Sequence, residues 1–359
     1  MSIDQFHSLE IKDIRQETAT AVSILFDVPD SLASMFQFKP GQHITLRADL
    51  DGDEVRRTYS LCAAPDDGEL RIAIKQVAGG RFSNWANTQL RIGERLDVMA
   101  PRGSFTRDFH GERPAHFLGI AGGSGITPIL SLLQSALTAQ PENRFTLLYG
   151  NRDGDSIMFL EKLAALKNRY MDRLQVYHVL SDEDQDLALF NGQFDAAKCM
   201  EIFGSLVDPD DADTLFICGP GIMMDEVEKA LLARGVPAAK LMFERFASAA
   251  PSAALVAQTR TLIEEASGRR FSVILDGRKR SATFSGDATN LLDSARSAGF
   301  EVPYACKAGV CATCRAKVVG GEVRMGVNYA LSAEEVTAGY VLTCQSVPVT
   351  DGVVLDYDA

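Results

Sequence analysis

Residues 303–318 read PYACKAGVCATCRAKV and hold three of the seven cysteines in this chain of 359 residues. Cys306, Cys311 and Cys314 are spaced C-x4-C-x2-C, and Cys344 follows farther along the chain. This is the spacing of the thiolate ligands of a plant-type [2Fe–2S] cluster. Three ligands on one short loop can converge on two irons, and the distant fourth ligand ties the loop to the rest of its domain. The loop therefore predicts a domain that holds a [2Fe–2S] cluster.

Other uses of these cysteines fit the pattern less well. A zinc site would more usually show two C-x2-C pairs, and the five histidines all precede residue 180. The absence of C-x-H pairs also excludes a Rieske cluster. Ala308 and Gly309 keep the loop small, so that backbone amides can approach the cluster sulfurs. Outside the loop, we expect Cys62 and Cys199 to be ordinary core residues.

The bulk composition predicts a cytoplasmic protein of two or three domains. A chain of 359 residues exceeds what one hydrophobic core usually organises, and 46% hydrophobic with 23% charged residues is typical of globular proteins. The net charge of −12 argues against a nucleic-acid partner. The charged N-terminal segment and the lack of an apolar run of roughly 20 residues argue against a signal peptide and a membrane span.

The first part of the chain, residues 1–110, predicts an antiparallel β-barrel. Three segments alternate or run apolar for the length of a strand, and turns at Asp51-Gly52 and Asp67-Gly68 lie between them. The segments are residues 42–50, 56–62 and 69–77.

Residues 111–246 alternate strand and helix patterns, which predicts a parallel sheet covered on both faces. The expected strands are residues 116–121, 145–150, 174–180, 214–219 and 240–246, and the expected helices are residues 128–140, 157–170 and 221–235.

Residues 247–268 are rich in Ala and Ser and lack an obvious core pattern, so we expect an interdomain linker there. The last domain, residues 269–359, begins with a predicted hairpin that turns at Asp276-Gly277. A helix is expected near residues 290–299. Ser332 and Glu335 form a capping-box pattern, which predicts the start of a short helix.

The cysteine loop resembles the ferredoxin module of oxygenase reductases, and the segments before it are similar to the ferredoxin–NADP reductase superfamily. This resemblance covers essentially the whole chain. It implies a FAD-binding β-barrel, an α/β domain that binds NAD(P)H, and an α+β ferredoxin domain of the β-grasp type. FAD rather than FMN is implied by the resemblance alone. Within the superfamily, the reductase subunits of ring-1,2-phenylacetyl-CoA epoxidases are most similar, followed by ketosteroid and alkane monooxygenase reductases.

Two short motifs in the barrel resemble the flavin-binding motifs of the superfamily. In the R-x-Y-S motif, Arg57 is implied to face the flavin phosphates, Tyr59 to stack on the isoalloxazine ring, and Ser60 to lie near N5. These roles suit a bidentate cation, a flat ring and a short hydroxyl. The second motif, G-R-x-S, is implied to hold the flavin phosphate and consists of Gly80, Arg81, Phe82 and Ser83.

A glycine-rich turn lies between the strand at 116–121 and the helix that follows. We expect Thr127 to be the N-cap of this helix and Pro128 its first residue, which places bare amides where a pyrophosphate would bind. The turn departs from G-x-G-x-x-G and instead resembles the G-G-x-G-x-T-P motif of the superfamily. Its predicted nucleotide-binding residues are Gly122, Gly123, Ser124, Gly125 and Thr127.

The remaining site predictions concern the nicotinamide and the adenosine ribose. By resemblance, the nicotinamide is bordered by Cys218, Gly219 and Pro220, with Glu244 beside it and Phe246 at the edge of the flavin. Ser60, Tyr59 and Glu244 are thus the predicted catalytic residues. Asn151 and Arg152 follow the strand at which the ribose is recognised. Because an arginine there can bind a 2′-phosphate, we expect NADPH in preference to NADH.

These predictions imply a reductase that passes electrons from NADPH through FAD and the cluster to a terminal oxygenase, most specifically phenylacetyl-CoA 1,2-epoxidase in phenylacetate degradation. The alternatives are the reductase of another oxygenase, or a passive iron–sulfur carrier, against which the complete flavin and nucleotide motifs weigh. Lys307, Arg315 and Lys317 flank the cluster loop. They predict either a basic docking face for an acidic partner or ordinary solvated surface charges.

Overall fold

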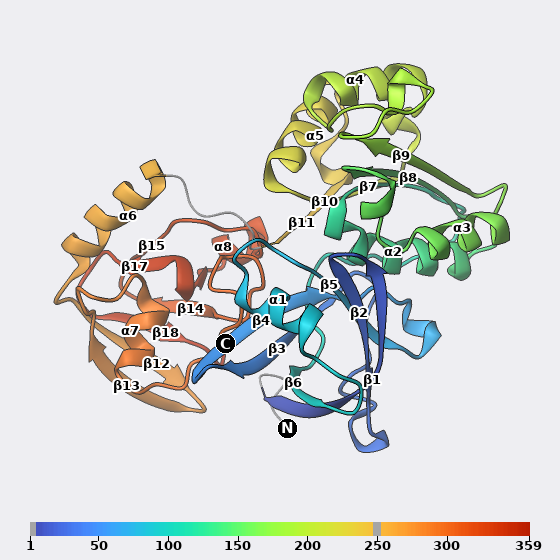
Figure 1. Cartoon of the computed structure of the whole chain (residues 1–359). Coiled ribbons are helices and arrows are strands. Elements are labelled where there is room, and N and C mark those ends of the chain that lie inside the picture. Colours follow the sequence, from blue (N-terminus) through green and yellow to red (C-terminus); the bar gives the residue numbers. More distant parts are fainter. Residues whose placement is uncertain (1–4, 247–252) are drawn as a thin grey trace. The chain divides into compact units, whose positions relative to one another are not determined.

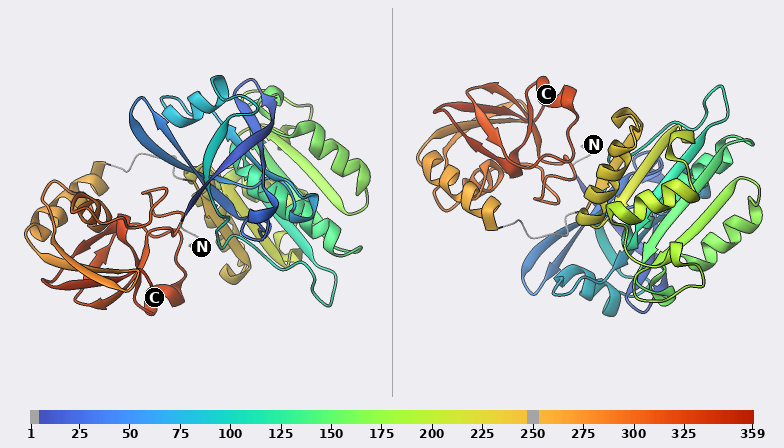
Figure 2. Two further views of the ribbon diagram at one scale, coloured as in Figure 1. Left: turned by 90° about the horizontal axis from the view of Figure 1, so that it is seen from below. Right: turned by 90° about the horizontal axis from the view of Figure 1, so that it is seen from above.

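The computed structural model describes residues 5–246 and 253–359. The chain divides into two compact units, Met1–Phe246 and Ala247–Ala359. Figure 1 labels the elements of both units, and Figure 2 shows them from two further directions. The first unit combines an antiparallel barrel with a parallel-sheet domain, and the second has a mixed sheet, as the sequence predicts.

The barrel consists of six antiparallel strands in the order β4-β3-β6-β1-β2-β5, and the outer strands β4 and β5 also contact each other. Its core contains Ile24, Leu46, Ile72 and Phe82. Asp51 and Gly52 both have positive φ, which suits the tight β3–β4 turn. The elements are β1 (Phe6–Thr18), β2 (Ala21–Asp27), β3 (His43–Leu50), β4 (Asp53–Ser60), β5 (Leu70–Lys75), α1 (Arg81–Thr88) and β6 (Arg95–Met99), with 3₁₀ turns at Asp30–Leu32 and Pro65–Asp67.

The second domain of this unit has five parallel strands in the order β11-β10-β7-β8-β9. Figure 1 shows α2 and α3 on one side of these strands and α4 and α5 on the other. The strand order reverses at β7 and β10, so the carboxyl ends of these neighbours form the expected ligand crevice. The elements are β7 (His116–Gly122), α2 (Ile126–Ala139), β8 (Arg144–Asn151), α3 (Leu160–Arg169), β9 (Leu174–Leu180), α4 (Ala196–Ser205), β10 (Thr214–Gly219), α5 (Gly221–Ala233) and β11 (Leu241–Arg245).

Two details of this domain differ from the sequence predictions. The N-cap of α2 is Gly125 rather than Thr127, because a 3₁₀ turn at Gly123–Gly125 leads directly into a helix that begins at Ile126. Thr127 is instead the second helical residue, and its hydroxyl donates to the carbonyl of Ser124 (3.0 Å). The helix α4 was not predicted, although Asp195 caps it by accepting from the amide of Lys198.

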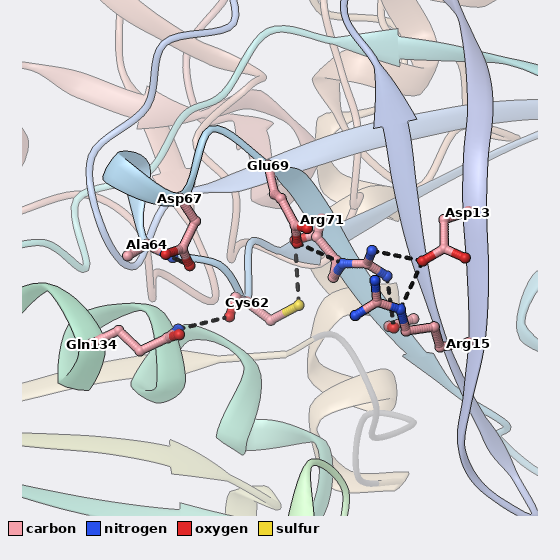
Figure 3. Close-up of polar contacts among 9 residues, drawn as sticks. Asp13, Arg15, Cys62, Ala64, Asp67, Glu69, Arg71 and Gln134 are labelled. Carbon is pink, nitrogen blue, oxygen red and sulfur yellow. Dashed lines mark hydrogen bonds and ion pairs between the residues drawn. The ribbon is translucent and has the colours of Figure 1, made fainter. Parts of the chain in front are cut away.

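A polar cluster joins the barrel to α2 (Figure 3). The Ser131 hydroxyl donates to the carbonyl of Ala63 (2.6 Å), and the Gln134 amide donates to the carbonyl of Cys62 (3.3 Å). The Cys62 thiol in turn donates to the carbonyl of Arg71 (3.4 Å), whose nearly buried guanidinium binds carboxylates on both sides. These contacts connect the barrel to the parallel-sheet domain within the first unit.

The second unit is built on a mixed sheet in the order β13-β12-β18-β14-β16, in which β12 and β18 are parallel. The predicted hairpin at Asp276-Gly277 and the capping box of Ser332 and Glu335 are both confirmed. The elements are α6 (Ala253–Ala266), β12 (Arg270–Leu275), β13 (Arg278–Thr283), α7 (Leu291–Ser297), β14 (Arg315–Gly320), β15 (Val323–Met325), α8 (Ala333–Thr337), β16 (Tyr340–Leu342), β17 (Ser346–Pro348) and β18 (Val353–Asp356).

Part of the segment that the sequence suggests as a linker is helical. Residues 247–252 lie outside the described residues, but Ala253–Ala266 forms α6. Ala266 is fully buried, and Leu262 and Ile263 pack against the core of the second unit. The end of this segment therefore belongs to the second unit, because its few apolar side chains fall on one face of a helix.

Within the described parts of the chain, the helices are too short or too polar to cross a membrane.

Candidate functional site

A polar junction forms where the end of the barrel meets the parallel sheet. The Ser60 hydroxyl donates to Oε2 of Glu244 (2.9 Å), and Nδ1 of His43 lies 3.5 Å from Oε1 of the same carboxylate. Ser60 and His43 are buried, at 4% and 6% exposure. The junction therefore unites Ser60 and Glu244, two residues predicted from motifs 184 positions apart.

Sequence reasoning missed His43, although the sequence contains a signal for it. In the hairpin that turns at Asp51-Gly52, His43 pairs directly with Ser60. Counting residues outward from this turn along the two antiparallel strands would have placed His43 opposite Ser60. Its other ring nitrogen, Nε2, is buried and has no hydrogen-bond partner among the described residues.

Cys218 lies on the sheet side of this junction. It pairs with Glu244 in the parallel register of β10 and β11 and is fully buried. Burial raises the pKa of its thiol well above the ordinary value, and the Glu244 carboxylate raises it further. At neutral pH Cys218 is thus a small, neutral group, which is suited to border a flat apolar ring rather than to act as a nucleophile.

The R-x-Y-S residues lie on β4, at the end that meets the junction. Arg57 and Tyr59 share one face of this strand because side chains alternate. Arg57 is exposed, and its guanidinium donates to the carbonyl of Arg56 (2.7 Å). The Tyr59 ring lies 5.8 Å from the Phe82 ring, and burial raises the pKa of its hydroxyl. This face of β4 therefore carries a cation, Arg57, and a neutral aromatic ring, Tyr59, close to the junction.

The G-R-x-S residues form the turn into α1. The Ser83 hydroxyl accepts from the amide of Val77 (3.1 Å) and donates to the carbonyl of Gly80 (3.2 Å). Arg81 forms an ion pair with Asp53 (2.8 Å). Phe82 is 1% exposed and belongs to the barrel core. The side chains of this motif thus support the turn, and its contribution to phosphate binding would come from helix amides.

The glycine-rich turn packs tightly against the Cys218-Gly219-Pro220 segment. A Cβ atom at Gly125 would lie 2.1 Å from the carbonyl oxygen of Cys218, and one at Gly122 would lie 2.8 Å from Cδ of Pro220. Only glycine fits at these two positions. The two motifs therefore meet at the carboxyl ends of β7 and β10, where the strand order reverses.

Two cationic side chains, those of Lys75 and Arg152, lie near the glycine-rich turn. Lys75 Nζ is 3.6 Å from the Cβ position of Gly123, at the end of β5. Burial lowers the pKa of Lys75, and the nearby Arg152 lowers it further. Sequence reasoning missed Lys75, because a lysine at a strand end has no distinguishing local pattern. Asn151 is the last residue of β8, at the same edge of the sheet.

In the second unit, the four predicted cluster cysteines come together as two pairs. Cys306 and Cys311 share a hydrogen bond that lowers the pKa of Cys311 and raises that of Cys306. Cys314 and Cys344 share another, which lowers the pKa of Cys344 and raises that of Cys314. Across residues 5–246 and 253–359, no group of three or more His, Cys, Asp or Glu side chains is arranged so that it could hold one metal ion. Two thiol pairs suit a binuclear cluster, in which each iron takes two protein ligands.

Amides of the loop point at these sulfurs. The amide of Ala308 donates to Sγ of Cys306 (3.3 Å), and the amide of Cys306 donates to Sγ of Cys311 (3.5 Å). Lys307 and Ala312 both have positive φ, a conformation that side-chain-bearing residues adopt at a cost. The strained backbone of the loop therefore turns its amides and thiols inward.

The three cations beside the loop are not equivalent. Lys307 forms an ion pair with Asp293 and Arg315 with Glu335, both at 2.7 Å. Lys317 lies 5.5 Å from the centre of the Tyr340 ring. The expected basic docking face is thus partly neutralised by acids of the same unit.

Comparison with known proteins agrees with this geometry. Residues 9–107 match the oxidoreductase FAD-binding domain family, residues 120–229 the oxidoreductase NAD-binding domain family, and residues 273–349 the 2Fe-2S iron-sulfur cluster binding domain family. The chain is 44% identical to a subunit of the 1,2-phenylacetyl-CoA epoxidase of Escherichia coli K12, over 99% of this chain and 98% of that protein. The chain belongs to the flavin- and [2Fe–2S]-dependent oxygenase reductases.

Further relatives of this oxygenase reductase support the same assignment. The ferredoxin reductase component of 3-ketosteroid-9-alpha-monooxygenase from Rhodococcus rhodochrous is 34% identical over 97% of this chain and 96% of its own length. Among solved structures, phthalate dioxygenase reductase matches 98% of both chains with a TM-score of 0.61 and 25% identity. An intact type IV self-sufficient cytochrome P450 monooxygenase shares the fold over 98% of this chain and 41% of its own, with a TM-score of 0.71 and 23% identity. The reductase uses FAD, a [2Fe–2S] cluster and a nicotinamide nucleotide.

Proposed function

We propose that this reductase takes electrons from NADPH and delivers them singly to the oxygenase of a phenylacetyl-CoA 1,2-epoxidase. The observation that carries the electron path is the junction of Ser60, His43, Glu244 and Cys218, because it unites the flavin motif with the nicotinamide motif. The choice of oxygenase is supported by the 44% identity to the Escherichia coli protein over nearly all of both chains.

FAD, when bound, would supply the chemistry that neither protein side chains nor the cluster can, namely the acceptance of a hydride and the release of single electrons. Residues of the barrel would hold this flavin. Arg57 would pair with its phosphates, and the Tyr59 ring would cover its isoalloxazine ring. The Ser60 hydroxyl, whose orientation Glu244 fixes, would face N5 and hold a proton there. His43 in turn positions the Glu244 carboxylate.

The nucleotide lies across the crevice between β7 and β10. Amides of the glycine-rich turn and the ammonium of Lys75 bind the pyrophosphate, and Cys218-Gly219-Pro220 leaves room for the nicotinamide. Hydride transfer requires the reacting atoms to approach to about 3–3.5 Å, so the task of the chain is to stack two rings and exclude water. Phe246 lies at the edge of this stack.

Arg152 supports the preference for NADPH. The neighbouring carboxylates are already engaged by the backbone, since Asp153 accepts from the amide of Ser156 (2.8 Å) and Glu183 from the amide of Gly154 (2.7 Å). Arg152 is exposed at the same turn and is free to meet a 2′-phosphate. Replacing Arg152 with Ala should therefore lower kcat/KM for NADPH and leave that for NADH unchanged.

Cys306, Cys311, Cys314 and Cys344 would hold the [2Fe–2S] cluster. The contacts between Cys306 and Cys311 and between Cys314 and Cys344 support this, because a [2Fe–2S] cluster takes two protein ligands on each of its two irons. The amides of the loop stabilise the negative sulfurs.

The partner is tested by reconstitution. Purified reductase is mixed with the oxygenase subunits of a phenylacetyl-CoA epoxidase or of a ketosteroid monooxygenase, and product is measured with NADPH present. The proposal predicts epoxidation of phenylacetyl-CoA and little steroid hydroxylation. The matched control is Cys344→Ser, which should retain NADPH-dependent flavin reduction and lose product. Equal coupling to the steroid enzyme would favour the second candidate, a ketosteroid-type reductase.

A further inference from the structure

Gln345 directly follows the fourth cysteine and touches both halves of the cluster site. Its Nε2 donates to the carbonyl oxygen of Lys307 (3.0 Å) and lies within hydrogen-bond distance of Sγ of Cys344 (3.6 Å). Lys307 belongs to the loop that carries the other three cysteines. One side-chain amide therefore bridges that loop and the distant ligand.

The chemistry of its partners fixes the orientation of this amide. A carbonyl oxygen and a thiolate are both acceptors, so only the NH₂ end of the amide can face them, and its two hydrogens serve the two acceptors. The aliphatic part of the Gln345 side chain packs closely against the loop: its Cγ lies 3.1 Å from the position that a Cβ atom would take at Gly309. Gly309 has a φ of +77°. The bare glycine thus makes the space in which the glutamine lies.

A donor at this position has a redox consequence. Reduction adds one negative charge to the cluster, and N–H groups that face its sulfurs stabilise that charge. The amides of Ala308 and Cys306, which also donate to cluster sulfurs, belong to the backbone, and only a proline substitution would remove them. Gln345 is a side chain, so its contribution can be removed while the fold of the loop is kept.

We infer that Gln345 is a positioning residue that raises the reduction potential of the cluster by donating its side-chain amide to the Cys344 sulfur. The inference rests on the proposed function, since it takes Cys344 as a ligand. It deepens that function, because the amide makes the cluster a better acceptor for electrons from the flavin.

The test is a redox titration of the full-length holoprotein, with the reduced cluster followed by its EPR signal. Gln345→Met removes the donor and keeps the length of the side chain. We expect the equilibrium constant for reduction to fall by up to about tenfold, which is 59 mV for a one-electron couple. The EPR signal per protein should be unchanged. Gln345→Leu should give a shift of the same sign.

Tyr357→Phe is the matched control. The Tyr357 hydroxyl donates to Thr343 (2.8 Å), the residue before Cys344, and Thr343 donates to the carbonyl of Cys314 (2.9 Å). This variant loses a hydrogen bond beside the same ligand but no donor to sulfur. Its reduction equilibrium should stay within twofold of the parent.

Three outcomes would overturn the inference. The first is an unchanged potential in both Gln345 variants with the cluster present. The second is an equal shift in Tyr357→Phe, which would mean that general loosening is the cause. The third is loss of the cluster from both Gln345 variants, because the amide would then be needed for assembly rather than for tuning. A parent protein without an EPR signal would instead contradict the proposed function itself.

Discussion

At the scale of single residues, Ser60 carries the most specific prediction. Its hydroxyl is held by Glu244 at 2.9 Å, so Ser60→Ala removes the group that we propose faces flavin N5 and little else. We expect hydride transfer to slow roughly 10- to 100-fold, which is about 1.4–2.7 kcal/mol of barrier. The measurement is the rate of anaerobic flavin bleaching by NADPH in stopped flow, with FAD content determined beforehand. Ser135→Ala, which removes a hydroxyl from the middle of α2, should leave the rate unchanged. Equal rates in parent and Ser60→Ala would show that the hydroxyl plays no part.

Lys75 predicts a dependence of nucleotide binding on pH. Burial and Arg152 lower the pKa of its ammonium below the ordinary 10.5. In the free protein, the charge is therefore lost as pH rises through this lowered pKa, and with it the attraction to the pyrophosphate. The Kd of NADP⁺ should accordingly rise in the alkaline range, starting below pH 10.5. Titration of flavin fluorescence at a series of pH values measures this. Lys75→Arg should flatten the profile, because arginine stays charged. A flat profile for the parent would contradict the placement of Lys75 at the phosphates.

At the scale of elements, the close approach of the α2 turn to β10 is the decisive contact. Gly125→Ala would put a Cβ atom 2.1 Å from the Cys218 carbonyl oxygen, so α2 and β10 must separate. We expect a loss of about 3 kcal/mol of stability, as for an overpacked core, and weaker nucleotide binding. Gly204→Ala is the control, because open space surrounds Gly204 within α4. That change should stabilise by about 0.5–1 kcal/mol. Thermal melting compares the two variants, and similar melting temperatures would refute the packing argument.

The elements also show how much of the fold and of the site could be predicted from the sequence alone. The C-x4-C-x2-C spacing predicted the gathering of the four cysteines. The resemblance of short motifs to the reductase superfamily assigned Ser60 to the flavin and Glu244 to the nicotinamide, but it did not predict their hydrogen bond. The sequence could not reveal Lys75, since its role depends on where the end of β5 lies relative to another domain. The N-cap of α2 was predicted two residues too late. A 3₁₀ turn at Gly123–Gly125 runs directly into the helix, and the sequence pattern does not show where the turn ends and the helix begins. It also missed that α6 ends in the core, since three apolar residues make too weak a pattern.

At the scale of the whole molecule, net charge and local charge have different consequences. The chain carries a net charge of −12, while Lys317 lies beside the cluster loop and, unlike Lys307 and Arg315, forms no ion pair among those described. If an acidic partner docks there, Lys317→Glu should slow electron delivery to the oxygenase several-fold, more so at low salt. NADPH-dependent reduction of a small dye should stay intact. Product formation and dye reduction measured side by side provide the check, and an equal loss of both would sink the docking hypothesis.

The central claim is a complete electron path within one chain, and an anaerobic titration of the purified protein with NADPH tests it most directly. The visible spectrum should show flavin bands and a broad iron–sulfur absorption, and both should bleach as NADPH is added. A flavin that bleaches while the cluster stays oxidised, or a protein that lacks either absorption, would contradict the account.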